Sequence, residues 1–140
     1  MSTKFNAAVY GIAENRGLVP HMETGLFRAD DDYRVPDQLF CRQHHLSERG
    51  AEGAELVVEV RSARDETYDK SPWYAQMGVR EMVVLHPQDR RVELFRALGG
   101  QLVPVQPGAE GELLSEVLGV TLRTVDGKLE ITWDGGSATV

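Results

Sequence analysis

The clearest strand pattern in the chain lies at residues 55–61, which read Glu-Leu-Val-Val-Glu-Val-Arg. Side chains alternate between two faces along a strand, and apolar residues occupy both faces here. This indicates a strand inside a sheet that is covered on both sides. Glu59 stands within this run, and an unpaired buried carboxylate is costly. Glu59 therefore needs a basic partner, a metal ion, a shell of hydrogen bonds or a solvent-lined cleft.

The rest of the pattern predicts a few helices among many short strands. Ser71 is the expected N-cap of one helix, with Pro72 at its first position, and an earlier start near Asp65, with Ser62 in a capping box, is the alternative. Trp73, Tyr74 and Met77 have helical spacing and are interpreted as core. The expected elements are a helix at 4–16, a strand at 18–28 interrupted near Gly25, strands at 33–41, 79–86, 91–97 and 101–105, a loop at 42–53, one helical turn at 113–118, and a hairpin of strands 120–125 and 128–133 around Asp126-Gly127.

The strands at 33–41 and 55–61 form an expected hairpin that places two acids side by side. If Asp37 faces Glu59, then Leu39 faces Val57. Facing residues of antiparallel strands lie about 4.5–5.5 Å apart. Two carboxylates at that distance repel each other, share a proton or hold a cation. A slip of two residues would separate the pair without changing its face.

Composition limits the class of protein more than its chemistry. The 140 residues, 41% of them hydrophobic, fit a single domain over 1–134 with a frayed tail at 135–140. The net charge of −7 argues against a basic nucleic-acid coat, although it leaves nucleic acid open as a substrate. No apolar run approaches the roughly 20 residues of a membrane helix. A single cysteine excludes an internal disulfide and, with no signal peptide recognised, favours the cytoplasm.

Several segments, in this order, resemble the Uma2 family, also called DUF820. They are Val35-Pro36-Asp37, residues 55–60, Asp69-Lys70 with Tyr74, residues 78–81, and a hydrophobic strand that ends at Pro87 before residues 91–96. The resemblance spans roughly residues 4–125. It implies the restriction-endonuclease-like fold of the PD-(D/E)xK superfamily, an α/β (α+β) fold with a mixed central β-sheet flanked by helices.

The resemblance also implies a Mg²⁺-dependent endonuclease that hydrolyses phosphodiester bonds of nucleic acid. Asp37 and Glu59 would be the metal ligands for Mg²⁺ or Mn²⁺, and Lys70 or Arg61 would assist at the phosphate. Phosphodiester hydrolysis needs an activated water and neutralisation of the developing charge. Two hard carboxylates can hold Mg²⁺ with positions left for water and phosphate.

Departures from the family pattern favour a second interpretation. Arg61 stands where the superfamily has Lys, and a guanidinium stays protonated and cannot act as a base. His86-Pro87 replaces a common Asp-Pro, and a further acid near the N-terminus is not recognised. The alternative is a catalytically weak or inactive domain of the same fold that acts in binding or oligomerisation. Edge strands near Gln101 and Lys128 are the expected sites of pairing in a homodimer. For Glu59, the alternative to a role in a site is a core carboxylate paired with Arg61 or Lys70.

Overall fold

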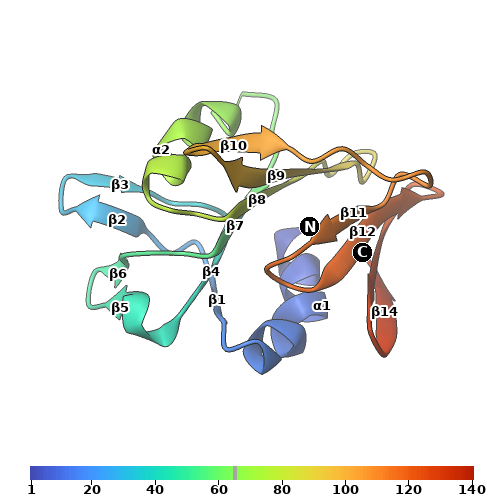
Figure 1. Ribbon diagram of the computed structural model, residues 1–140, viewed down its shortest axis with the longest axis horizontal. Coiled ribbons are helices and arrows are strands. Elements are labelled where there is room, and N and C mark those ends of the chain that lie inside the picture. The colour runs from blue at the N-terminus through green and yellow to red at the C-terminus, as the bar shows by residue number, and fades with distance from the viewer. Residues whose placement is uncertain (65) are drawn as a thin grey trace.

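A six-stranded mixed sheet forms the centre of the computed structural model, which describes residues 1–64 and 66–140 (Figure 1). The strand order is β1-β4-β7-β8-β9-β10. The strands β7 and β8 are parallel, and every other neighbouring pair in this sheet is antiparallel. The strands are β1 (Val19–Met22), β4 (Gln38–Cys41), β7 (Leu56–Val60), β8 (Glu81–Leu85), β9 (Val92–Leu98) and β10 (Gln101–Pro104).

The central strand β7 is covered on both faces, as its sequence predicts. Helix α1 (Ser2–Asn15) packs on one face, where Leu56 and Val58 share a core with Phe5. Val57 points to the other face and joins a second core with Tyr74 of helix α2 (Ser71–Gln76). The connection through α2 returns the chain to the starting end of β7, which is why β8 runs parallel to it.

A second sheet covers the α1 side of the central sheet and completes that core (Figure 1). Its strands, in spatial and chain order, are β11 (Leu113–Ser115), β12 (Val120–Val125), β13 (Lys128–Trp133) and β14 (Gly136–Thr139). Asp126 and Gly127 both adopt positive φ, at 51° and 74°. These left-handed residues make the tight hairpin that the Asp-Gly pair predicts.

A third, smaller sheet lies beside the first half of the central sheet and was not expected. Its order is β3 (Asp32–Arg34), β2 (Leu26–Ala29), β6 (Gly50–Ala51) and β5 (Leu46–Ser47), with a 3-10 turn η1 (Gln43–His45) before β5. The predicted strand at 33–41 is split, because Pro36 cannot donate to a ladder and the chain changes sheets at that point. The predicted loop at 42–53 contains the β5–β6 hairpin, which pairs with β2 through Leu26 and Ala51.

Three expectations about the last third of the chain were wrong. Residues 113–115 form strand β11 instead of a helical turn, because Leu113 and Ser115 are buried on alternate positions and pair with β12. The expected frayed end is strand β14, and the backbone of Val140 exchanges two hydrogen bonds with Leu129. The strand that begins at Lys128 is internal, so it is not the expected edge, whereas the strand that begins at Gln101 is an edge.

The segment before β8 is helical from a slightly earlier point than the N-cap at Ser71 predicts. A 3-10 turn η2 (Tyr68–Lys70) leads directly into α2, whose N-cap position is Lys70. Pro72 lies in the first turn, where its missing N–H costs nothing. The alternative start near Asp65 lies outside the described residues. In the described ranges, no helix is long and apolar enough to cross a membrane.

Candidate metal and phosphate site

Asp37 lies against the end of strand β7 in the register that the sequence predicts. Leu39 pairs with Val57, which confirms the expected hairpin register, and Asp37 follows one step beyond the last pair. The carboxylate oxygen Oδ2 of Asp37 accepts a hydrogen bond from the N–H of Val60 at 2.6 Å. Its carbonyl oxygen accepts another from the N–H of Glu23 at 3.0 Å. These two contacts hold the Asp37 carboxylate beside Glu59.

Glu59 is only 3% exposed, and its carboxylate is surrounded by donors. The hydroxyl of Tyr74 donates to Oε1 of Glu59 at 2.6 Å. The ammonium of Lys70 lies 3.3 Å from Oε1 and 3.4 Å from Oε2. Lys70 and Tyr74 are four residues apart along η2 and α2, so one helical face presents both to the same carboxylate.

The protonation of this cluster follows from burial. Burial is the largest influence on the pKa of Glu59 and raises it, and the nearby charge of Asp37 raises it further. The hydrogen bond from Tyr74 and the charge of Lys70 lower this pKa, but the net effect is an increase. Burial, with the charge of Glu59 beside it, also raises the pKa of Tyr74 far above its usual range, so the phenol stays protonated and donates. A cation placed between Asp37 and Glu59 would favour the ionised pair.

Arg61 follows Glu59 by two residues and lies just beyond the end of β7, so its side chain is on the same face of the sheet as that of Glu59. Its guanidinium stacks 4.7 Å from the centre of the Tyr68 ring. It also lines a pocket that opens at the carboxyl ends of β7 and β8. The structure therefore brings Asp37, Glu59 and Lys70 together, and places Arg61 in an adjoining pocket.

The donor set of Asp37 and Glu59 suits a small hard cation. Mg²⁺ is commonly bound by one or two carboxylates and keeps several waters or substrate oxygens. Two adjacent carboxylates, one of them desolvated, fit that requirement. Within residues 1–64 and 66–140, no group of three or more His, Cys, Asp or Glu side chains gathers as a metal cage. Any metal held by this pair would therefore depend on water or phosphate for its remaining ligands.

Tyr74 is the residue whose contact with Glu59 the sequence interpretation missed. It was assigned to the core, which is correct for its ring, since its exposed fraction is 0%. The available signal was the four-residue spacing from Lys70. Trp73 fixes the same helix from the other side, because its indole N–H donates to Asp32 at 2.9 Å. Helix α2 is thereby tied both to β3 and to the carboxylate of β7.

Replacing Tyr74 with Phe is expected to destabilise the protein more at neutral pH than in acid. Phe keeps the ring packing but removes the donor to Glu59, at a cost of about 1–3 kcal/mol. The hydrogen bond from Tyr74 favours the ionised carboxylate of Glu59. Its contribution is therefore lost as the pH falls through the pKa of Glu59 in the folded protein, which burial raises above the ordinary value of 4.5. Denaturant unfolding over a pH series from neutral to acid measures this difference.

The matched control for that experiment is Tyr10→Phe. Tyr10 lies on α1 and is 44% exposed. Removing the hydroxyl of Tyr10 is expected to change the free energy of unfolding by less than about 0.5 kcal/mol at any pH of the series. A cost for Tyr74→Phe that stays constant across the pH range would show that the Tyr74 hydroxyl does not act through the ionised carboxylate of Glu59.

Comparisons with known proteins agree with the fold described above. The sequence profile of the Uma2 family, described as "Putative restriction endonuclease", matches residues 2–126. A crystal structure from Anabaena variabilis ATCC 29413, described as a "putative nuclease belonging to DUF820", superposes with a TM-score of 0.64. The two share 12% sequence identity, and the match covers 84% of this chain and 70% of that one. No curated protein matches the chain significantly.

Proposed function

This chain belongs to the Uma2 family, and we propose that it is a Mg²⁺- or Mn²⁺-dependent endonuclease that hydrolyses phosphodiester bonds of nucleic acid. The observation that carries the proposal is a cluster of three residues. Asp37 and Glu59 lie at the ends of the neighbouring strands β4 and β7, and Lys70 reaches Glu59 from the turn η2. Together with Tyr74, this cluster combines two carboxylates, one cation and a fixed phenol donor on one face of the sheet. The fold of the Anabaena structure supports the same assignment at the level of architecture.

Each residue has a distinct role in the proposed site. Asp37 and Glu59 hold the metal, which would supply charge neutralisation and a more acidic water. Lys70 holds Glu59 in place through its ammonium. The side chain of Lys70 is 25% exposed, so the ammonium can also contact a phosphate oxygen. Tyr74 is a positioning residue, because it acts on the substrate only through Glu59.

The proposed reaction is a hydrolytic displacement at phosphorus. The oxygen of an activated water forms a new bond to phosphorus, and the ester P–O bond on the opposite side breaks. The products are a phosphate monoester and a free hydroxyl, and solvent takes up the proton that the attacking water releases. Lys70 lies where it can stabilise the negative charge that develops on the phosphate during this step.

A second candidate is a catalytically weak or inactive domain that acts in binding or oligomerisation. The observation that favours it is the ion pair itself, because Lys70 and Tyr74 already satisfy the Glu59 carboxylate without a metal. The edge strand β10 offers unpaired backbone groups to a second copy of the chain. Under this alternative, the carboxylate cluster stabilises α2 on the sheet and has no reaction to perform.

Calorimetric titration with Mg²⁺ and Mn²⁺ tests the proposal. Wild-type protein is expected to bind either ion saturably, and Asp37→Asn is expected to weaken binding about ten- to a hundredfold. The Asn variant keeps an amide oxygen that can accept from the N–H of Val60, so the local fold is preserved. Absence of metal binding by the folded wild type, or equal binding by both proteins, contradicts the proposed site.

A further inference from the structure

The strand registers place a row of three basic side chains directly beyond the carboxylate row. Glu59 pairs across the sheet with Val84, and Val84 pairs with Glu93. The pairing continues past the strand ends, because the N–H of Arg61 donates to Leu85 and the N–H of His86 donates to Arg91. Side chains two residues along a strand return to the same face. Arg61, His86 and Arg91 therefore form the next row on the face that carries Glu59.

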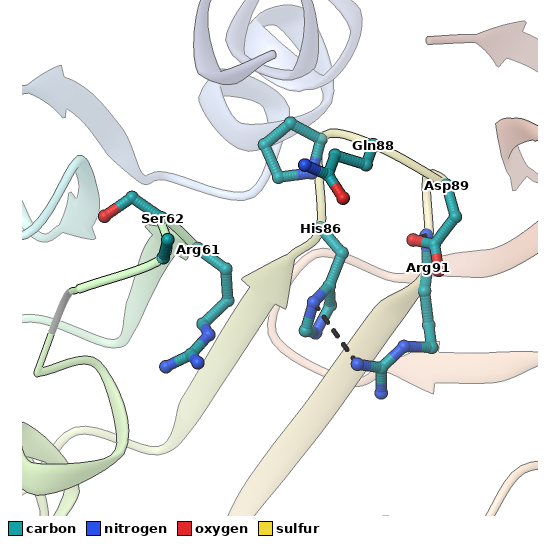
Figure 2. A pocket seen from close by; sticks show the side chains of 8 residues that line it. Arg61, Ser62, His86, Gln88, Asp89 and Arg91 are labelled. Atoms are coloured by element: carbon teal, nitrogen blue, oxygen red, sulfur yellow. Dashed lines mark hydrogen bonds between the residues drawn. The ribbon is translucent and has the colours of Figure 1, made fainter.

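This second row lines a pocket of about 440 Å³. Figure 2 shows Arg61 and Arg91 on either side of His86, with Ser62 on one side of the pocket and Gln88 and Asp89 on the turn that closes the other side. The row lies about 6.6 Å from Glu59 along β7, because each strand residue advances roughly 3.3 Å. If one phosphate of a nucleic-acid strand is held at Asp37 and Glu59, the next phosphate along the strand can reach this row across that distance.

Two contacts inside the pocket orient the His86 ring. The guanidinium of Arg91 lies 3.3 Å from Nδ1 of His86, and Nε2 of His86 lies 2.8 Å from a carboxylate oxygen of Glu93. The side chain of Arg91 is 58% exposed, whereas those of His86 and Glu93 are 14% and 28% exposed.

Among the described residues, the carboxylates of Asp89, which lines the pocket, and Glu93, which contacts His86, each accept hydrogen bonds from neighbouring groups. Burial alone raises the pKa of Glu93, but hydrogen bonds from Tyr68 and His86 outweigh it and lower that pKa, so Glu93 is ionised and turned toward its donors. Asp89 accepts the backbone N–H of Arg91 at 3.0 Å, which lowers its pKa. The guanidinium of Arg91 is more than half exposed, so it can donate to an incoming anion from this position.

We propose that Arg61 and Arg91, which lie on either side of His86, form a subsite for a second phosphate of the nucleic-acid backbone, adjacent to the phosphate held at Asp37 and Glu59. The assignment of the anion to a nucleic acid rests on the proposed function. The guanidinium fork matches the geometry of phosphate oxygens, and Arg61 is held in place by Tyr68. This subsite binds and positions the strand, and takes no part in breaking the bond.

Titration of inorganic phosphate into metal-free protein, followed by NMR, tests the subsite without any reaction. The side-chain N–H signals of Arg61 and Arg91 are expected to shift saturably with phosphate. Arg91→Gln is expected to weaken phosphate binding about ten- to a hundredfold, because hydrogen bonds to a charged group contribute roughly 1.5–3 kcal/mol. Arg91→Lys keeps the charge but loses the fork, and is expected to fall between the wild type and Arg91→Gln.

The matched control is Arg80→Gln, which removes an equal charge at the opposite end of β8. Arg80 is 54% exposed and pairs with Glu55, so phosphate binding is expected to be unchanged. Signals of Arg61 and Arg91 that do not move, or equal binding by Arg91→Gln and wild type, overturn the subsite. Binding of a single-stranded oligonucleotide to Asp37→Asn, with and without Arg91→Gln, must show the same order for the anion to be a backbone phosphate.

These measurements separate the subsite from the reaction. If phosphate binds at Arg61 and Arg91 but the wild type cleaves neither DNA nor RNA with metal, the proposed reaction is wrong and the anion subsite stands. If the wild type cleaves nucleic acid and Arg91→Gln binds phosphate and oligonucleotide as the wild type does, the subsite is wrong and the reaction stands.

Discussion

Replacing Glu59 with Gln is expected to reduce metal-dependent cleavage of nucleic acid about a hundredfold or more. The amide keeps the shape of the side chain and an oxygen that can accept from Tyr74, but it removes the charge that would hold the metal in the proposed site. A bound metal contributes several kcal/mol to the transition state of such reactions. Each 1.36 kcal/mol corresponds to a tenfold change in rate. Initial rates on single- and double-stranded DNA and RNA, with Mg²⁺ or Mn²⁺ in excess, measure the loss.

Glu55→Gln is the matched control for this experiment. It removes the same charge at the opposite end of the same run, where Glu55 pairs with Arg42 and Arg80 at the surface. Cleavage by this variant is expected to match that of the wild type. Undiminished cleavage by purified Glu59→Gln would place the reaction at another site or in another protein, and cleavage that survives a chelator would contradict the metal.

Replacing Glu81 with Ala is expected to destabilise the protein by about 3–5 kcal/mol. Glu81 is 1% exposed and joins the central sheet to the β11–β12 connection. Its carboxylate accepts from the hydroxyl of Ser115 at 2.7 Å, from the backbone N–H groups of Glu116 and Val117 at 2.9 and 3.3 Å, and from Arg96 at 3.1 Å. Removing it leaves these donors without their acceptor in a buried place, which is where a lost partner is most costly.

Thermal and urea unfolding measure the effect of Glu81→Ala. A loss of this size corresponds to a fall in Tm of roughly 10–15 °C for a chain of this length. Glu116→Ala is the control, because Glu116 is 56% exposed and meets Arg96 only at 3.7 Å, so its removal is expected to cost less than about 0.5 kcal/mol. A free energy of unfolding for Glu81→Ala within 1 kcal/mol of the wild type would contradict this account.

Hydrogen exchange would locate the damage caused by Glu81→Ala. The backbone amides of Glu116 and Val117 donate directly to Glu81, so they are expected to lose protection first. The hairpin of β12 and β13 has its own ladder and should keep more of its protection. Uniform loss of protection across both sheets would instead mean that the whole domain unfolds as one unit.

Local pattern was sufficient wherever a signal lay within a few residues. Alternation around Glu59 predicted a strand buried on both faces, and Asp126-Gly127 predicted a two-residue hairpin, because both depend on local periodicity or backbone preference. The hairpin register at Leu39 and Val57 followed from matching two buried patterns. The short strands β5 and β6 escaped notice, since each has only two residues, and the hairpin that they form joins a sheet only through the pairing of β6 with distant β2.

The sequence by itself determined that Glu59 lies in a strand with apolar residues on both faces, because alternation is a property of a short segment. It placed Asp37 beside Glu59 only in one of two possible registers, since a slip of two residues keeps the same face. Only the tertiary structure decided which cation meets that pair. Lys70 and Tyr74 reach Glu59 because α2 packs across the sheet and turns one helical face toward β7. Arg61 joins His86 and Arg91 because parallel β8 and antiparallel β9 align in one register. These alignments join residues far apart in the chain, and packing of the whole domain sets them.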